Sequence, residues 1–171
     1  MKFQPDSPAG KEIEVPFFED ARADVAPGYD IRRPIQDLKS DVINVLAQLG
    51  AADIHIQSGK FEYRKPGVTN GARYGFLIQF TVYGQPAQMQ VAGLPMRQTD
   101  TEVKREKVLR QALFVVHLQL KAMITVRVFS PGSAPLIQYV LVPGTEHTVS
   151  EYIATARGIP NMNPQMPGGA P

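Results

Sequence analysis

One stretch of alternating side chains limits the fold of this chain more than any other feature. Over Tyr74–Tyr83, bulky apolar residues occupy every second position, which is typical of a strand with one buried face. Gly84-Gln85 follows as a two-residue connection with glycine first, which favours a type II′ turn, and the alternation resumes over Ala87–Val91. The pattern predicts a β-hairpin. With 171 residues, 43% of them hydrophobic, the chain has enough apolar surface for one core built around it.

Two helices are predicted on either side of this hairpin. Apolar residues recur at three- and four-residue spacing between Pro34, which suits a first turn, and Gly50, which suits a C-terminal stop. Thr99 and Glu102 form a capping-box pattern, and an apolar stripe runs from there to Met123. Residues 124–129 fit either continued helix, which we favour, or a fresh strand.

The remaining segments complete an α+β expectation. Alternation from Ile54 to Tyr63 indicates a further strand, and Thr148–Ala156 indicates a brief final helix. We therefore predict a two-layer fold with a helix, a three-stranded antiparallel sheet, a long packing helix and a short C-terminal helical appendix. The expected organisation is an extended acidic arm at 1–33, a single α+β domain at 34–157 and a Pro/Gly-rich tail at 158–171.

Composition argues against several classes of chemistry. The absence of cysteine excludes disulfides, thiol catalysis and cysteine-based metal sites. The three histidines, His55, His117 and His147, fall on different predicted elements without a carboxylate at ligand spacing, and neither a P-loop nor a nucleophile elbow occurs. We therefore expect no catalytic residue, no metal, no cofactor and no enzyme activity. No run of about 18 apolar residues and no leader peptide is present, so we expect no membrane association.

Charge is unevenly distributed along the chain. Residues 1–30 carry three basic and seven acidic side chains, a balance of −4, whereas the remainder stands at +6. An acidic arm on a basic body is typical of a nucleic-acid-binding surface with an intramolecular competitor, although a solvated leader gives the same counts.

The sequence resembles a family of small phage- and prophage-encoded proteins, most of them without an assigned activity. The order of short motifs from about Val42 to the C-terminus carries this resemblance, whereas the family's tryptophans are missing here and its acidic stretch is replaced by Ser130–Pro135. The matching segments are Leu49-Gly50-Ala51, Gly75-Phe76, Leu94-Pro95, Arg110-Gln111-Ala112-Leu113 with Lys121, Leu141-Val142-Pro143-Gly144, Thr148–Tyr152 and a Pro-rich tail. The resemblance implies a place in the cytoplasm of a bacterial host cell. By fold analogy, it also implies a role in phage recombination or replication like that of proteins that anneal single strands.

Candidate nucleic-acid-binding residues gather in two places. The segment Gln57–Tyr74 combines cations with aromatic side chains around a Gly/Pro loop, and cations meet phosphates while aromatic rings stack on unpaired bases. Its members are Lys60, Phe61, Tyr63, Arg64, Lys65, Arg73 and Tyr74. The outer side of the long helix presents Lys107, Arg110 and Lys121, with Phe114 expected to be exposed among them. The alternative interpretations are aromatic residues packed on the core and an ordinary solvated helix face.

Two functional hypotheses follow from these residues. The first is a protein that binds single-stranded nucleic acid, with DNA as the expected form, without sequence specificity, and acts in annealing or replication as a homo-oligomer. The second is a non-catalytic structural or adaptor protein that binds a protein partner through an apolar helix face and the Pro-rich tail. Free sheet edges support self-association in either case.

Overall fold

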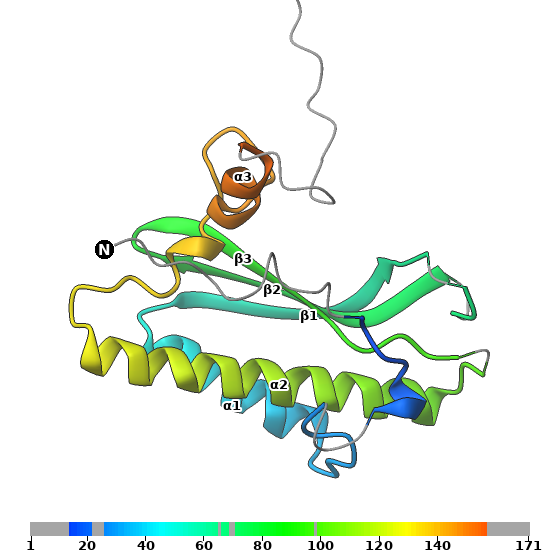
Figure 1. Cartoon of the computed structure of the whole chain (residues 1–171). Helices are drawn as coiled ribbons and strands as arrows, with labels where there is room; N and C mark the ends of the chain where they lie inside the picture. The colour runs from blue at the N-terminus through cyan, green and yellow to red at the C-terminus, as the bar shows by residue number, and fades with distance from the viewer. Residues whose placement is uncertain (1–13, 22–25, 65, 69–70, 98, 157–171) are drawn as a thin grey trace, which may run out of the picture.

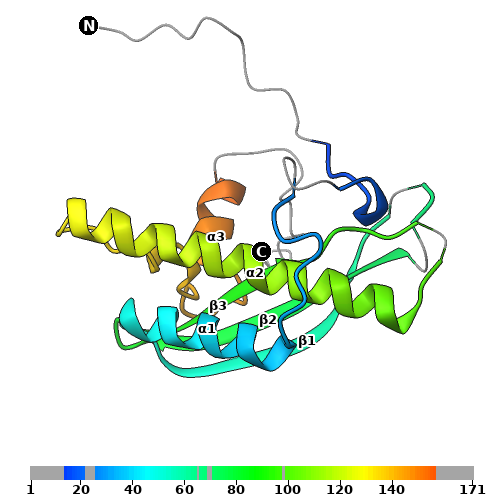
Figure 2. The same ribbon diagram turned by 90° about the horizontal axis from the view of Figure 1, so that it is seen from below.

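The computed structural model describes residues 14–21, 26–64, 66–68, 71–97 and 99–156. Three antiparallel strands, β1 (Ala52–Glu62), β2 (Ala72–Val82) and β3 (Gln85–Ala92), form one sheet in the order β1-β2-β3. Helices α1 (Ile35–Gln48) and α2 (Glu102–Phe129) lie side by side on one face of this sheet (Figures 1 and 2). The predicted α+β fold and its order of elements are confirmed. Residues 124–129 continue the long helix.

The core lies between the sheet and the two long helices. Phe76, Ile78, Phe80 and Val82 point from β2 toward the helices and are almost fully buried, as the alternation predicts. They pack against apolar side chains of both helices: Leu38, Val42, Val45 and Leu46 from α1, and Ala112, Leu113, Val116 and Leu120 from α2. Helix α1 ends as predicted at Gly50, whose φ of +94° lets the Ala51 amide donate to the Leu46 carbonyl at 3.0 Å.

Two local predictions are wrong by one or two residues. The β2–β3 turn consists of Tyr83 and Gly84, both with positive φ, so it is a type I′ turn and not a Gly84-Gln85 type II′ turn. Helix α2 is capped by Thr101, whose hydroxyl accepts from the Lys104 amide at 3.3 Å, and not by Thr99.

The described part of the N-terminal region is docked on the domain. Phe18, in the short 3-10 helix η1 (Phe18–Asp20), packs in a second apolar cluster with Tyr74, Met96 and Val108. The Phe18 amide donates to the Pro95 carbonyl at 2.8 Å. Part of the predicted arm at 1–33 therefore contacts the core of the domain, whereas residues 1–13 and 22–25 lie outside the described residues.

The C-terminal part returns to the sheet. Val140 forms an isolated bridge with Ala87 of β3, after the 3-10 helix η3 (Ile137–Tyr139). The final helix α3 (Val149–Ala156) begins with a reciprocal capping box, in which Glu151 accepts from the Thr148 amide at 2.7 Å and Thr148 accepts from the Glu151 amide at 3.3 Å. Helix α3 stands on the side of the sheet opposite α1 and α2 (Figure 1). The predicted tail at 158–171 lies outside the described residues.

Helix α2 is the one helix in the described segments that is long and apolar enough to cross a membrane. Its most apolar 18-residue window has a mean hydropathy of 1.6, and 22% of that window is buried. Core helices of soluble proteins also meet this criterion of length and composition, so the finding is weak evidence for a membrane span.

Candidate nucleic-acid interface

One face of the sheet carries no long helix, and the strand register identifies its residues. Directly paired residues of antiparallel strands point to the same face, so the partners of Leu77 and Gln79 share the face opposite the core. We call this surface the open face. Its members are His55, Gln57, Gly59 and Phe61 of β1; Arg73, Gly75, Leu77, Gln79 and Thr81 of β2; and Pro86, Gln88, Gln90 and Ala92 of β3.

The open face has an unusual composition for this chain. It contains no carboxylate, although the protein has 16 Asp and Glu residues. Gln57, Gln79 and Gln90 are exposed, and each amide can both donate and accept hydrogen bonds. The surface is therefore polar without repelling an anion, and its amides can pair with many polar partners.

The C-terminal segment occupies the end of the open face next to the β2–β3 turn. The Leu141 amide donates to the Pro86 carbonyl at 2.9 Å, and the Gln88 side chain donates to the Glu146 carbonyl at 3.4 Å. The part of the open face that is farther from this turn, toward Phe61 and Arg73, makes neither contact.

An aromatic group terminates the open face at the β1–β2 loop. Phe61 lies close to Gly75: a Cβ built on that glycine would be 2.9 Å from Cε2 of Phe61 and 2.0 Å from the Val91 carbonyl oxygen. Glycine is therefore required at this position, because any larger residue would displace the ring or the neighbouring strand. The half-buried Phe61 ring is held at the edge of the sheet, where a flat partner can stack on it.

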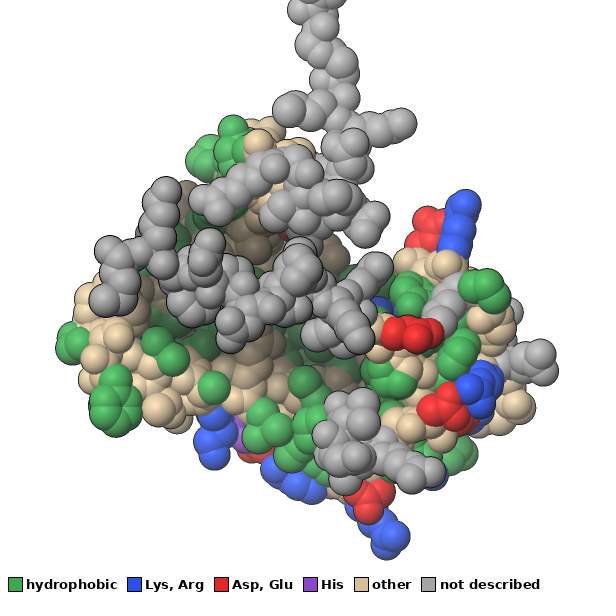
Figure 3. Space-filling view, viewed as in Figure 1, with side chains coloured by type: hydrophobic (Ala, Val, Ile, Leu, Met, Phe, Trp, Pro, Cys, Tyr) green, Lys and Arg blue, Asp and Glu red, His purple; other side chains and the backbone are tan. Residues whose placement is uncertain are grey.

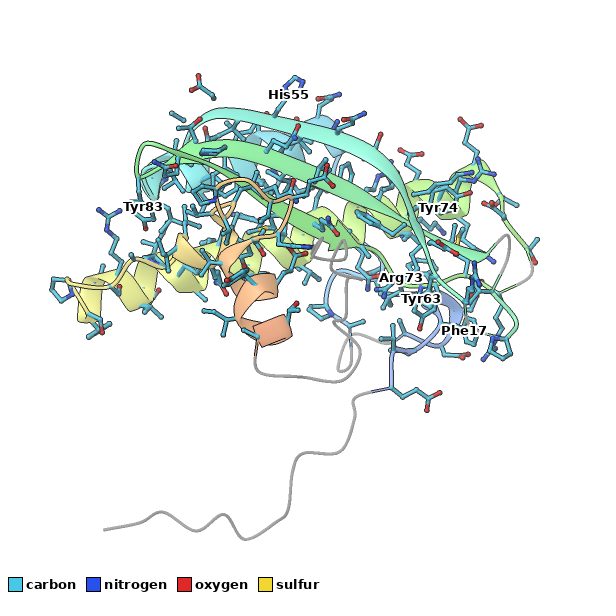
Figure 4. The ribbon with its side chains drawn as sticks, turned by 90° about the horizontal axis from the view of Figure 1, so that it is seen from above. Phe17, His55, Tyr63, Arg73, Tyr74 and Tyr83 are labelled. Carbon is cyan, nitrogen blue, oxygen red and sulfur yellow. The ribbon has the colours of Figure 1, made fainter. Side chains whose placement is uncertain are left out.

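Arg73 acts mainly to hold this end of the sheet together. Its Nε donates to the Gly93 carbonyl at 2.7 Å, its Nη2 donates to the Ala92 carbonyl at 3.2 Å, and its guanidinium lies 5.0 Å from the centre of the Tyr63 ring. Burial lowers the pKa of Arg73 from its usual value. Figure 4 shows Tyr63, Arg73 and Phe17 together at this end, far from Tyr83 at the β2–β3 turn. These contacts give Arg73 a positioning role, and its predicted phosphate contact stays a prediction.

Tyr74 faces the core, so the predicted base stacking by its ring is wrong. The side chain is 9% exposed, and its hydroxyl donates to Oδ2 of Asp100 at 2.7 Å. Burial and this hydrogen bond raise the pKa of Tyr74. The Lys60 ammonium and the Arg105 guanidinium lie 5.3 and 5.1 Å from the centre of its ring, so the ring serves packing.

Two exposed cations remain beside the β1–β2 loop. Lys60 lies on the face of β1 opposite Phe61, and Arg64 is 88% exposed and paired with the exposed Glu62 at 2.6 Å. Exposed ion pairs of this kind contribute little to stability, so Arg64 can exchange Glu62 for a phosphate at small cost. Lys65 lies outside the described residues.

The three helix cations all lie on α2, in two different surroundings. Lys107 and Arg110 line a pocket with Tyr29 and Arg32. Lys121 instead lies near Asp41 of α1, whose pKa is lowered mainly by the hydrogen bond from Arg33 and further by the charge of Lys121.

Phe114, between these cations, is half-buried. A Cβ on Gly28 would lie 2.6 Å from its ring. The predicted exposure of Phe114 is wrong because residues 26–32 cross the helix there.

The acidic N-terminal segment pairs with cations of the body. Glu19 accepts from the Lys104 ammonium at 2.6 Å and from the Arg97 amide at 3.0 Å, and Asp20 pairs with the Arg97 side chain. Partial burial would raise the pKa of Glu19, but the hydrogen bonds from Lys104 and backbone amides outweigh it and lower that pKa. The described N-terminal acids thus neutralise two basic side chains at the hairpin end, where side chains of both charges gather (Figure 3).

Sequence reasoning missed several residues that the structure brings forward. The glutamines of the open face could have been predicted, because Gln88 and Gln90 alternate with buried residues and so must lie on the face opposite the core. No sequence pattern could have identified Tyr29 and Arg32, since they lie in an aperiodic segment rich in proline. The three histidines lie on β1, on α2 and in the loop before α3, and within the described ranges no group of three His, Asp or Glu side chains is arranged to hold a metal ion.

Comparison with known proteins adds no relative. No family model matches the chain, no curated protein is significantly similar to it, and no solved structure matches its fold significantly.

Proposed function

We propose that this protein binds single-stranded nucleic acid, with DNA as the expected form, across the open face of its sheet. The observation that carries the proposal is the combination of a sheet face without carboxylates and an aromatic ring, Phe61, at its end. A sheet backed by helices on one side, with exposed aromatic residues on the other, is a common way to bind unpaired bases. The fold supports this proposal only by analogy with other sheet proteins, whereas the composition of the open face supports it on chemical grounds.

The proposed division of labour follows the contacts. Phe61 and the half-buried Tyr63 stack on bases, and the glutamine amides meet base edges. Arg64, with Lys65, meets phosphates at the end of this face, whereas Lys60, on the opposite face of β1, adds only long-range attraction. An amide that both donates and accepts can serve any base edge, so we expect little sequence preference. Arg73 stays on its carbonyl partners and orients Tyr63.

Fluorescence anisotropy with a labelled oligothymidine across a salt series tests the proposal. Phe61→Ala should weaken binding by about 1–3 kcal/mol and leave the salt slope unchanged, because stacking releases no counterions. The double variant Arg64→Gln/Lys65→Gln should reduce the slope of log affinity against log salt by about 0.7 for each phosphate that the protein no longer neutralises, and Lys60→Gln, on the opposite face of β1, should reduce it less. A protein that binds neither DNA nor RNA oligonucleotides at low salt would refute the proposal.

A second candidate function, a non-catalytic adaptor, rests on the C-terminal end of α2. Val126, Val128 and Phe129 are 52%, 69% and 83% exposed, and Ile137 in the following 3-10 helix η3 is 47% exposed. Several large apolar side chains exposed at one helix end are common at protein contact sites. This function would be favoured if Val128→Ser/Phe129→Ser removed an interaction with a protein partner while the parent protein bound no oligonucleotide.

A further inference from the structure

A small pocket between the N-terminal segment and α2 carries a concentration of positive charge. It is lined by Tyr29, Asp30, Ile31, Arg32, Lys107 and Arg110, and its volume is about 140 Å³. That volume is well above the roughly 10–15 Å³ that a cavity needs to hold one water molecule, and well below the roughly 300 Å³ at which sites for drug-sized ligands begin. The pocket therefore suits a small ionic group and not a whole nucleotide.

The pocket is built on fixed elements. Gln111 of α2 is 3% exposed, and its amide donates to the Ala26 carbonyl at 3.3 Å, which holds the start of the segment against the helix. Phe114 lies one turn after Gln111 on α2. Gly28 of the N-terminal segment contacts its ring so closely that a Cβ on this glycine would lie 2.6 Å from the ring. Tyr29 stacks on the buried Phe18, with ring centres 4.9 Å apart. These contacts hold the backbone that leads to Arg32 against α2, which lowers the entropic cost of binding.

The charges in the pocket are incompletely balanced. Asp30 is the one carboxylate among the lining residues, against Arg32, Lys107 and Arg110. Glu106 pairs with Nη2 of Arg110, whereas Arg32 and Lys107 have no ion pair within the described part of the chain. Nε of Arg110 is buried without a hydrogen-bond partner among the described residues, and a buried donor of this kind is costly unless an acceptor reaches it.

We propose that this pocket binds a phosphate group in its dianionic form. The lining residues carry a net charge of +2, or +1 when Glu106, the ion-pair partner of Arg110, is counted. A terminal phosphate carries about −1.5 to −2 at neutral pH and a phosphodiester only one charge, so the site should attract the terminal phosphate more strongly. Guanidinium and ammonium groups together are the side chains that bind phosphate most strongly. The site is separate from the open face, so it does not depend on the function proposed above.

Titration of the full chain with inorganic phosphate, at constant ionic strength set by chloride, tests this site. Heteronuclear NMR should show saturable shifts confined to the amides of residues 28–32 and 106–111. Arg32→Gln and Lys107→Gln, both exposed on the surface, should each weaken the affinity about tenfold or more. Arg127→Gln, an exposed cation near the other end of the same helix, is the matched control and should leave it unchanged.

Two further measurements distinguish whether the ligand is a free phosphate compound or the phosphorylated end of a nucleic-acid strand. An oligothymidine with a 5′-phosphate that binds more tightly than its 5′-hydroxyl counterpart, with the difference lost in Lys107→Gln, would identify the strand end as the ligand. Equal binding of the two oligonucleotides, with inorganic phosphate still bound, would identify a small phosphate compound. Absence of saturable phosphate binding, or an equal loss in Arg127→Gln, would overturn the proposal. Circular dichroism melts of each variant confirm that the fold is kept.

Discussion

Single residues at the hairpin end divide into those that hold the fold and those that are free to bind. Tyr74 belongs to the first group, because its hydroxyl donates to Asp100, a carboxylate that also pairs with Arg105. Phe61 and Arg64 belong to the second group, since neither is fully buried and Arg64 pairs with an exposed carboxylate. Nearby aromatic positions on the two hairpin strands therefore have different roles.

Tyr74→Phe should destabilise the protein without affecting the proposed interface. Removing a hydrogen bond to a charged, nearly buried carboxylate costs about 1.5–3 kcal/mol, measured as the free energy of unfolding in urea. Tyr83→Phe, at a 49% exposed position, is the control and should change stability by less than about 0.5 kcal/mol. Loss of oligonucleotide binding at unchanged stability would restore Tyr74 to the interface.

Two paired glycines on the open face should respond in opposite ways to alanine. Gly59 and Gly75 are cross-strand partners, yet a Cβ at Gly75 would lie 2.0 Å from the Val91 carbonyl oxygen, whereas a Cβ at Gly59 meets nothing within 4 Å. Gly75→Ala should therefore lower the free energy of unfolding by about 1–3 kcal/mol or more, because the neighbouring strand must move. Gly59→Ala should leave it unchanged or raise it by up to about 1 kcal/mol. Similar effects of both changes in urea unfolding would show that the strands at Gly75 are not so closely packed.

At the scale of elements, the N-terminal segment is tied to the domain by charge as well as by Phe18. Glu19 has a lowered pKa, so its contribution to stability is present above its ordinary value near 4.5 and is lost as the pH falls through the lowered value. Glu19→Gln should cost about 1 kcal/mol at neutral pH. The difference between parent and variant should vanish in acid.

Urea unfolding of both proteins at neutral pH and in acid measures this dependence. A parent and a Glu19→Gln variant that differ equally at both pH values would show that the carboxylate charge does not anchor the segment.

The elements also show how far sequence reasoning reaches. The burial of Phe76, Ile78, Phe80 and Val82 was predictable because period-two alternation in an antiparallel strand has one physical cause, a single buried face. The same alternation places Tyr74 on the buried side, so its packing role was predictable too, but the density of nearby cations favoured a binding role. The β2–β3 turn was predicted one residue too late, because Tyr83 adopts a φ of +54°, a conformation that residue preferences assign to glycine, asparagine or aspartate.

The candidate site was predictable only in part. Local spacing identified Phe61 and Arg64, because a strand that ends in a Gly/Pro loop exposes its last residues. The charged pocket required tertiary structure, since it joins Arg32 to Lys107 across 75 positions in the chain. Residues 26–32 meet α2 at the contact between Gly28 and Phe114, and no periodic sequence pattern predicts a contact of this kind.

In the whole molecule, the charged side chains of the hairpin end, which lie among apolar ones, are far from the exposed C-terminal end of α2 (Figures 1 and 3). Charged side chains gather around the β1–β2 loop and η1, whereas exposed apolar side chains mark the C-terminal end of α2 (Figure 3). Exposed apolar clusters of this kind favour association. The predicted homo-oligomer is therefore proposed to form through the end of α2, which leaves the open face accessible.

Light scattering coupled to size exclusion checks this proposal. The parent should exceed the mass of a monomer, 18.8 kDa, and Val128→Ser/Phe129→Ser should shift it toward that mass. Val103→Ser, at a 66% exposed position in the first turn of the same helix, is the control. A parent that is monomeric at high concentration would contradict the proposed oligomer.

If the open face binds a polyanion because it lacks carboxylates, carboxylates added to this face should weaken binding. Gln79→Glu/Gln90→Glu changes two exposed side chains to isosteric acids, and Gln36→Glu/Gln48→Glu makes the same change of net charge on exposed positions of α1. In anisotropy titrations with labelled oligothymidine, the open-face variant should lose affinity about tenfold or more, and the α1 variant should lose much less. Equal losses in the two variants, or no loss in either, would contradict the claim.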